Sequence, residues 1–140
     1  KMNIIQLMIP KVSTAFAYEN DSVRQGLESM RHHGYTAIPV LSDDNTYLGC
    51  ITEGDFLRFV LKRGSTDMKD FEQFKIGDLL RKDFCRPLKI QASTEEVIEV
   101  ALQQNFVPIT DDRDAFCGII TRRSLLVYLS KQNGEDDKKL

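Results

Sequence analysis

Two short segments, Thr52-Glu53-Gly54-Asp55 and Thr121-Arg122-Arg123-Ser124, carry the residue types best suited to bind a ligand. Each follows an apolar run typical of a strand and opens a pattern typical of a helix. The N-terminus of a helix has free N–H groups and a partial positive charge, so it attracts anions. The second segment places two arginines there, which costs about 0.3–1 kcal/mol each if nothing compensates them. A bound phosphate would compensate them, because guanidinium groups pair with phosphate in bidentate geometry.

Both segments also have simpler interpretations. The first could be a well-capped helix, in which Thr52 is the N-cap and Glu53 and Asp55 lie beside the positive end. Alternatively, Asp55 accepts hydrogen bonds from a ribose diol. In the second segment, nearby acids could neutralise the arginines, namely Asp111, Asp112 and Asp114. The residue types alone leave these alternatives open.

The two segments belong to an internal repeat. Three pairs of residues recur at a separation of 69 inside matching apolar runs: Pro39 and Pro108, Gly49 and Gly118, Thr52 and Thr121. Each copy predicts a first helix with a capping box, Ser22-x-x-Gln25 or Ser93-x-x-Glu96, and Gly34 closes the first of these helices. Two strands and a second helix follow, with strands at residues 37–41, 47–52, 106–110 and 115–121 and second helices at residues 53–61 and 122–129.

The repeat predicts an α+β fold of two βαββα units. We expect the first unit at residues 4–62, a polar linker at 63–75, the second unit at 76–130 and a frayed polar tail at 131–140. A small sheet with helices on one face leaves its other face uncovered, so the two units should pack together about a pseudo-two-fold axis. This packing would create a cleft between them, which is a common place for a ligand.

The opposite wall of that cleft would come from the first unit. Gly34-Tyr35-Thr36-Ala37 enters a predicted strand, and residues 11–17 form an extended segment before the first helix. Tyr35 offers a flat ring for a base and Thr36 offers a hydroxyl, although Tyr35 could equally pack in the core. Backbone groups near Ala15 and Ala37 could pair with the edge of an adenine.

The composition narrows the classes of function. A net charge of −2 argues against a broad basic surface for polymeric nucleic acid. No apolar run is long enough to cross a membrane, and no secretory signal opens the chain. We expect no metal site, because no pair of the three cysteines makes a CxxC motif and the two histidines are adjacent. Cys50 and Cys117 lie in apolar runs, where a thiol acts as a small hydrophobe. Free thiols of this kind fit a reducing compartment, so we expect cytoplasmic localisation.

The strand–turn–helix segments resemble a pair of CBS domains, also called a Bateman module. The resemblance runs from about residue 4 to residue 130 and rests on three stretches: residues 34–41, 48–55 and 117–123. It implies a module that binds adenosyl ligands between its repeats and commonly forms a homodimer. Two stretches taken together are similar to stand-alone bacterial CBS-pair proteins that bind cyclic di-AMP. They are Gly34-Tyr35-Thr36-Ala37-Ile38-Pro39 and Gly118-Ile119-Ile120-Thr121-Arg122-Arg123.

The resemblance assigns two candidate sites. In the first, Tyr35, Thr36 and Ala37 would hold the base, and the two arginines would hold the phosphates. The full set of residues of this site is Lys11, Ser13, Ala15, Tyr35, Thr36, Ala37, Pro39, Thr121, Arg122 and Arg123. The family's turn often ends in an aspartate that binds ribose, whereas the second copy has Ser124. A second site would use Thr52, Asp55, Arg86, Asn105, Phe106 and Val107.

These observations predict a regulatory protein and not an enzyme. It would have no cofactor, would bind an adenine-nucleotide second messenger, most simply cyclic di-AMP, and would signal to a protein partner. There are two alternatives. One is an AMP, ADP or ATP energy sensor, in which Asp55 matters more than the arginines. The other is a ligand-free dimerisation module.

Overall fold

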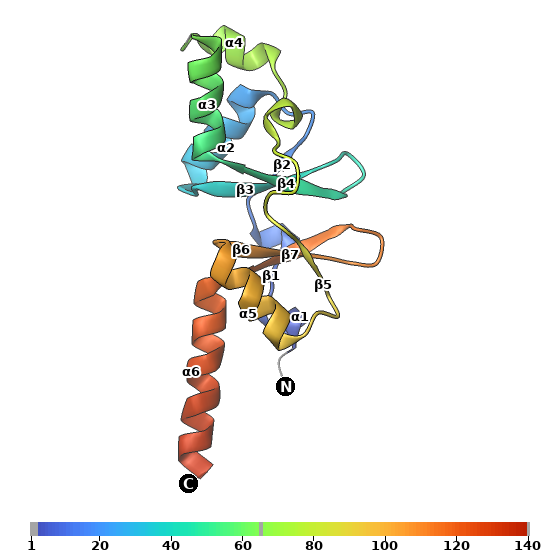
Figure 1. The fold of residues 1–140 in the computed structure, drawn as a ribbon, viewed down its shortest axis with the longest axis vertical. Coiled ribbons are helices and arrows are strands. Elements are labelled where there is room, and N and C mark those ends of the chain that lie inside the picture. The colour runs from blue at the N-terminus through green and yellow to red at the C-terminus, as the bar shows by residue number, and fades with distance from the viewer. Residues whose placement is uncertain (1–2, 65, 140) are drawn as a thin grey trace.

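The computed structural model describes residues 3–64 and 66–139, so residue 65 of the predicted linker and residue 140 of the predicted tail lie outside the described residues. The chain folds into two units stacked along the long axis, with their sheets facing each other at the centre (Figure 1). The upper unit contains β2 (Ala17–Tyr18), α2 (Val23–His33), β3 (Ala37–Leu41), β4 (Tyr47–Thr52), α3 (Glu53–Arg63), α4 (Met68–Gln73) and the 3-10 turn η2 (Ile76–Leu79). The lower unit contains α1 (Ile4–Leu7), β1 (Ile9–Pro10), β5 (Leu88–Lys89), α5 (Thr94–Gln103), β6 (Phe106–Thr110), β7 (Phe116–Thr121) and α6 (Arg122–Lys139). The predicted α+β fold of two βαββα repeats is confirmed.

The two sheets have the same core arrangement. In the upper sheet the order is β2-β3-β4, and in the lower sheet it is β1-β7-β6-β5. Each contains an antiparallel hairpin, β3–β4 or β6–β7, and a short strand parallel to the first strand of that hairpin. The lower sheet gains a fourth strand because β1, from the start of the chain, pairs antiparallel with β7.

The units exchange their leading segments. Ile4 and Leu7, near the start of the chain, lie in the lower hydrophobic core with Val97, Val107 and Ile120. Ile76, which precedes the second repeat in sequence, is fully buried in the upper core. The 3-10 turn η1 (Lys11–Ser13) crosses from the lower sheet toward the upper one. Neither hydrophobic core is therefore made from one continuous half of the chain.

Local sequence signals fix the first helix of each unit. The Ser22 side chain accepts from the backbone N–H of Gln25, and the Gln25 side chain accepts from the Ser22 N–H, which completes the predicted capping box. Ser93 and Glu96 form the same box on α5. Gly34 ends α2 in the left-handed region, with φ of 70°, a conformation that glycine adopts without strain.

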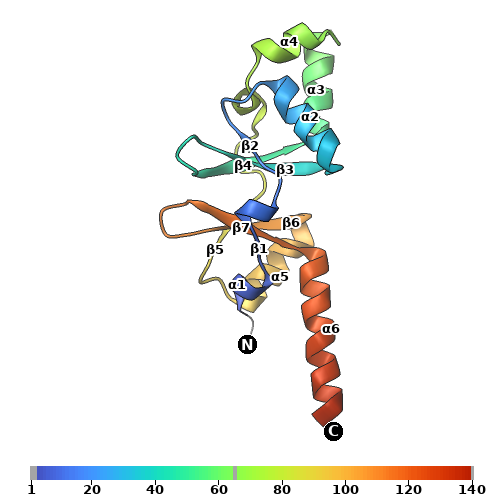
Figure 2. The same cartoon turned by 180° about the vertical axis from the view of Figure 1, so that it is seen from behind.

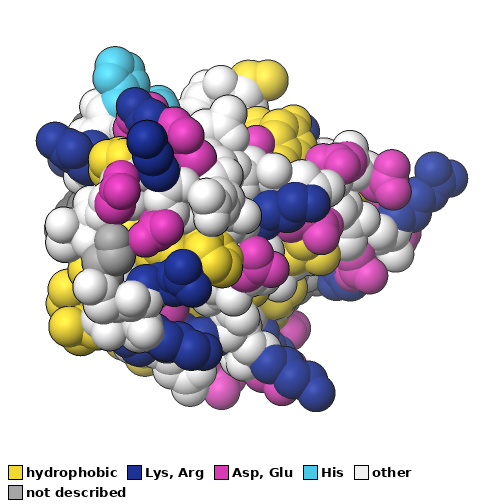
Figure 3. All heavy atoms as spheres, turned by 90° about the horizontal axis from the view of Figure 1, so that it is seen from above, with side chains coloured by type: hydrophobic (Ala, Val, Ile, Leu, Met, Phe, Trp, Pro, Cys, Tyr) yellow, Lys and Arg dark blue, Asp and Glu magenta, His cyan; other side chains and the backbone are white. Residues whose placement is uncertain are grey.

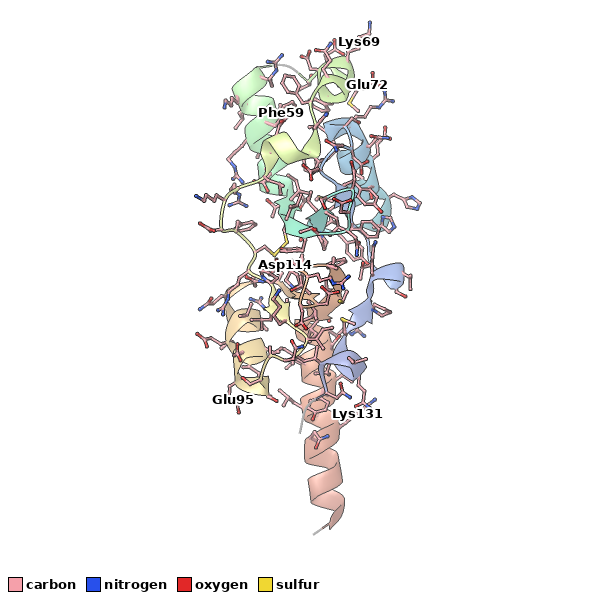
Figure 4. All side chains as sticks on the ribbon, turned by 90° about the vertical axis from the view of Figure 1, so that its right-hand side faces the viewer. Phe59, Lys69, Glu72, Glu95, Asp114 and Lys131 are labelled. Carbon is pink, nitrogen blue, oxygen red and sulfur yellow. A yellow bond between two sulfur atoms is a disulfide. The ribbon has the colours of Figure 1, made fainter. Side chains whose placement is uncertain are left out.

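Backbone bonds join the tips of the two hairpins. The Tyr47 N–H donates to the Asp114 carbonyl at 3.0 Å, and the Phe116 N–H donates to the Asn45 carbonyl at 2.9 Å. The Tyr47 and Phe116 rings stack with centroids 6.2 Å apart. Figure 4 shows Asp114 at the level where the two units meet. These contacts fix the relative position of the sheets at one end of the interface.

Two boundaries differ from the prediction. The last helix was expected to end near residue 129 before a frayed tail, but α6 continues to Lys139. The tail contains no proline, so its backbone can continue the helix even though its residues are polar. The predicted linker also contains a short helix, α4, which Asp67 caps and which buries Phe71.

The end of the molecule seen in Figure 3 carries basic and acidic side chains intermingled, without a continuous field of one sign. Within residues 3–64 and 66–139, no helix is both long and apolar enough to cross a bilayer.

Candidate functional site

The first cleft lies between the sheets and has two adjoining parts. An inner pocket of about 230 Å³ is lined by Ile9, Ser13, Thr14, Ala15, Tyr35, Thr36, Ala37, Pro39, Asn105, Phe106, Ile119 and Thr121. An outer pocket of about 420 Å³ is lined by Gln6, Leu7, Ile9, Thr121, Arg123, Ser124, Val127, Tyr128 and Lys131. Ile9 and Thr121 belong to both linings, so the two pockets adjoin each other.

Both repeats build the inner pocket. Ala37 and Pro39 come from β3, while Ile119 and Thr121 come from β7 of the other unit. Tyr35 is half-exposed and stacks on His33 with ring centroids 5.9 Å apart and planes within 5°. The N–H and carbonyl of Ala15 have no hydrogen-bond partner among the described residues. The pocket therefore combines apolar surface, an aromatic ring and unpaired backbone groups, which suits a flat heterocycle.

The outer pocket lies at the N-terminus of α6. Thr121 caps this helix, because its Oγ1 accepts from the Ser124 N–H at 3.0 Å and lies 2.8 Å from the Ser124 hydroxyl. Arg123 and Lys131 supply two cations, and among the described side chains none that lines this pocket is acidic. Figure 4 shows Lys131 on α6 below the sheets. Helix dipole and side chains together make this part of the cleft attractive to an anion.

Arg122 does not line either pocket. Its Nε donates to the Ala101 carbonyl at 2.6 Å, and one terminal nitrogen donates to the Leu102 carbonyl at 3.3 Å. The other terminal nitrogen lies 3.5 Å from Asn105 Oδ1. Arg122 thus caps the C-terminal end of α5, where carbonyl groups lack helical partners and favour a cation. This contact accounts for Arg122, one of the two adjacent arginines, without a bound ligand.

Lys11 also has protein partners. Its Nζ hydrogen-bonds to Asn45 Oδ1 and lies 5.0 Å from the centroid of the Phe16 ring. Of the ten residues predicted for the first site, seven line the inner pocket, namely Ser13, Ala15, Tyr35, Thr36, Ala37, Pro39 and Thr121. Arg123 lines the outer pocket, and Lys11 and Arg122 lie outside both linings.

Sequence reasoning missed several lining residues. Ile9 and Ile119 enter the cleft because β1 pairs with β7, a long-range contact that no local pattern predicts. The repeat itself could have indicated Lys131, which lies 69 residues after Lys62 on the equivalent helix. Asn105 and Phe106, predicted for the second site, line the inner pocket of the first.

The pseudo-symmetric second cleft has an outer pocket of about 580 Å³, lined by Asp55, Arg58, Phe59, Lys62, Arg63, Phe74, Asp78, Leu79 and Arg81. Several of its residues lie at repeat positions equivalent to the first outer pocket, for example Phe59 and Tyr128. Asp55, although buried, is engaged by protein groups: Arg58 lies 2.5 Å and Arg81 2.8 Å from its Oδ1, and the Thr52 N–H and hydroxyl donate to its Oδ2.

The ionisation of Asp55 follows from those contacts. Burial alone would raise the pKa of this carboxyl, but the hydrogen bonds from the Thr52 N–H and from Arg58 outweigh it, with help from the Thr52 hydroxyl and the charge of Arg81. The pKa is therefore lowered from its ordinary value of 3.8. Asp55 is an ionised carboxylate that is already paired, which leaves little hydrogen-bonding capacity for a ribose diol.

In the inner part of the second cleft, a protein side chain takes backbone hydrogen-bonding groups. The Gln104 amide accepts from the Arg86 N–H at 3.0 Å and donates to the Arg86 and Phe106 carbonyls at 2.8 and 3.0 Å. In the repeat, Arg86 corresponds to Ala15 and Phe106 to Ala37, so Gln104 occupies backbone groups equivalent to those of the first cleft. Val107, the last of the predicted second-site residues, is completely buried.

A disulfide also lies in this region. Cys50 on β4 is bonded to Cys85, with Cα atoms 5.9 Å apart, so the prediction that Cys50 acts only as a small hydrophobe is wrong. The two residues are 35 positions apart, and only the tertiary fold brings them together. Cys117 is free and half-buried, and burial raises the pKa of its thiol.

Comparison with known proteins places the fold in a family. The sequence model of the CBS domain matches residues 4–62 and 76–131. The cyclic di-AMP receptor B of Bacillus subtilis (strain 168) is 25% identical over 126 residues, which cover 90% of this chain and 85% of the receptor.

Solved structures show the same fold. CbpB in complex with c-di-AMP superposes with a TM-score of 0.90 at 20% identity, covering 99% of this chain and 91% of that chain. The Listeria monocytogenes CbpB complex with c-di-AMP has a TM-score of 0.81 at 22% identity, covering 95% of this chain and 98% of that one. CBSX2 in complex with AMP has a TM-score of 0.77 at 18% identity, with coverage of 95% and 99%. Because the family model matches both repeats, this chain belongs to the CBS domain family.

Proposed function

We propose that this protein is a non-catalytic regulator that binds cyclic di-AMP in the first cleft. The observation that carries the proposal is that a neutral inner pocket adjoins a cationic outer pocket, whose lining has no acidic side chain within the part of the chain that the structure describes. A nucleotide has the same division, with an uncharged base joined to an anionic phosphate. The cyclic di-AMP receptor of Bacillus subtilis and the CbpB complexes, which share the fold, support this choice.

The inner pocket would hold one adenine. Tyr35 has one ring face against His33, so its other face and its edges remain for the base. The unpaired N–H and carbonyl of Ala15 could pair with the donor and acceptor on one edge of the adenine. Pro39 and Ile119 would enclose the base from the two sheets.

The outer pocket favours a phosphodiester over a mononucleotide. Arg123 and Lys131 would neutralise the phosphate, and the N-terminus of α6 would add its dipole. Each ribose of a 3′,5′-linked cyclic dinucleotide has only its 2′ hydroxyl free, so a diol-binding carboxylate would find no diol. Ser124 stands where the family often has that aspartate.

AMP, ADP or ATP is the second candidate ligand. It is favoured by the CBSX2 complex with AMP, which has the same fold. Calorimetric titration with cyclic di-AMP, AMP, ADP and ATP separates the candidates. We expect the tightest binding for cyclic di-AMP. If none of the four nucleotides gives heat of binding at submillimolar concentration, nucleotide binding is overturned in favour of a ligand-free dimerisation module.

A charge substitution sharpens this comparison. Ser124→Asp restores the carboxylate at the turn, so it should weaken cyclic di-AMP binding and strengthen AMP binding. Ser130→Asp adds the same charge to an exposed position of α6 outside both pockets and is the matched control. If both variants change the two affinities equally, Ser124 does not select the ligand.

We also propose that the protein forms a homodimer. α3 and α6 leave the sheets on the same side and run in opposite directions (Figures 1 and 2). They carry exposed apolar residues, of which Leu57, Leu61 and Leu126 are 62%, 72% and 65% exposed. A second copy could cover these side chains. Light scattering should give twice the chain mass, and Leu57→Glu with Leu126→Glu should give the monomer mass.

Signalling would require a protein partner that distinguishes the free from the ligand-bound surface. A partner with equal affinity for both states would transmit nothing. Affinity capture from the source cell with and without cyclic di-AMP tests this requirement, because a regulated partner should be retained in only one of the two conditions.

A further inference from the structure

The Cys50–Cys85 pair joins the two units covalently. Cys50 lies on β4 of the upper sheet and is almost completely buried. Cys85 is partly buried and lies in an otherwise exposed segment that leads into β5 of the lower sheet. In Figure 4 the disulfide lies at the level where the two units meet. The bond therefore ties β4 of the upper sheet to the segment that leads into β5 of the lower sheet.

The repeat shows what the two cysteines replace. Cys50 lies 69 residues before Ile119, and Cys85 lies 71 residues after Thr14, the offset that also relates the capping residues Ser22 and Ser93. Ile119 and Thr14 both line the inner pocket of the first cleft. The disulfide thus occupies the part of the second cleft that is equivalent to the ligand pocket of the first.

Tyr47 positions the pair. Its hydroxyl donates to the Cys85 carbonyl at 2.6 Å and lies 3.3 Å from Cys50 Sγ. Burial raises the pKa of the Tyr47 phenol, so the hydroxyl remains a hydrogen-bond donor. The Cys85 backbone is thus held beside Cys50 by a contact that does not depend on the S–S bond, which favours re-formation of the bond after reduction.

We propose that Cys50 and Cys85 form a reversible thiol–disulfide site, and that its oxidation strengthens ligand binding in the first cleft. The co-reactant would be a low-molecular-weight disulfide in the oxidising direction and a dithiol in the reducing direction. The effect on affinity rests on the proposed function, whereas the thiol chemistry does not.

The chemistry is two thiol–disulfide exchanges. The more exposed thiol, Cys85, loses its proton and attacks one sulfur of the small disulfide, which forms a mixed disulfide and releases one thiolate. The Cys50 thiolate then attacks Cys85 Sγ and releases the second thiolate. In sum, two protein thiols become one disulfide, and the small disulfide is reduced to two thiols.

The coupling to the first cleft follows from the strand register. Cys50 is the cross-strand partner of Pro39, which lines the inner pocket. The opposite wall of that pocket belongs to the lower sheet, so a tether between sheets fixes both walls relative to each other. A cleft whose walls are already fixed loses less conformational freedom when the ligand binds.

The experiment compares full-length protein treated with oxidised glutathione with protein treated with dithiothreitol. Peptide mapping without reduction should recover the Cys50 and Cys85 peptides linked only after oxidation. Titration with cyclic di-AMP should give an affinity at least about five-fold higher for the oxidised protein. The double variant Cys50→Ser with Cys85→Ser should bind like the reduced protein in both treatments, and Cys117→Ser, the control, should keep the difference.

The outcomes are distinguishable. Absence of linked peptides after oxidation would overturn the thiol–disulfide site itself. Linked peptides with equal affinity in both states would overturn the coupling to the ligand and leave the proposed function standing. Linked peptides without binding of cyclic di-AMP in either state would overturn the proposed function, and the coupling with it, but not the site.

Discussion

The Nε of Arg122 lies 2.6 Å from the carbonyl oxygen of Ala101, so this arginine caps α5 instead of lining the cleft. Its neighbour Arg123 lines the outer pocket. Two adjacent residues of the same type thus face different parts of the molecule, because successive residues on a helix point about 100° apart. The difference gives the two arginines separable roles.

Replacement of the two arginines should therefore have different effects. Arg123→Ala should weaken cyclic di-AMP binding by about ten-fold or more, since a hydrogen bond to a charged group is worth about 1.5–3 kcal/mol. Arg122→Ala should lower the free energy of unfolding by about 1 kcal/mol through loss of the helix cap, with a smaller effect on affinity. Calorimetry and urea denaturation of both variants measure these quantities. A larger loss of affinity in Arg122→Ala would reverse the assignment.

Tyr35 should contribute through its ring and not through its hydroxyl. Tyr35→Ala removes the stacking face, which costs about 1–3 kcal/mol per base in comparable sites, so affinity for cyclic di-AMP should fall by about ten-fold or more. Tyr35→Phe keeps the ring and should bind within about two-fold of the parent protein. Equal losses in the two variants would show that the hydroxyl is what the ligand needs.

Asp55 should stabilise the fold without binding ligand. Asp55→Asn removes the charge that Arg58 and Arg81 pair with, and it should lower the free energy of unfolding by about 2 kcal/mol at pH 7. This is less than for a wholly buried ion pair, because the two arginine side chains are 59% and 41% exposed. The affinity of the first cleft should not change.

The pH dependence of this effect has a definite sign. The pKa of Asp55 is lower in the folded protein than its ordinary value of 3.8, so the folded state favours the ionised form. The stabilisation is complete above the ordinary value and is lost as the pH falls through the folded-state value. The difference between parent and Asp55→Asn should therefore be constant from pH 7 to about 5 and shrink below about 4. The exposed Asp112→Asn is the control, and a parent–variant difference at pH 3 that is as large as the difference at pH 7 would contradict the ion-pair explanation.

Gly118 and Gly49 test the strand exchange. A Cβ on Gly118 would lie 2.2 Å from the Ile9 carbonyl oxygen, whereas a Cβ on Gly49 would have its nearest contact at 3.5 Å, with Leu80. The two glycines have similar φ angles of 159° and 152°, so backbone strain should be similar and the steric clash should differ. Gly118→Ala should be less stable than Gly49→Ala by about 1–3 kcal/mol. Equal unfolding midpoints would show that β1 moves away from β7 at little cost.

The sequence predicted the scaffold because its signals are local. Ser22 and Ser93 cap helices within three residues, and Pro39 and Pro108 mark equivalent strands in the two copies. The candidate site was only partly predictable, because Ile9 enters the cleft through the pairing of β1 with β7 and Cys50 meets Cys85 only in the folded chain. The direction of the Arg122 side chain depends on the free carbonyls of α5, and no local pattern encodes that contact.

The pairing of β1 with β7 also has a consequence for synthesis of the chain. Ile9 and Pro10 leave the ribosome well before their partners Ile119 and Gly118, which belong to β7 at the far end of the second repeat. The upper core can assemble once Ile76 has emerged, while Ile9 and Pro10 remain unpaired until β7 has been translated. The cleft shared by the two units should therefore close after both cores have begun to form, so a nascent chain would have no complete ligand site before β7 has emerged.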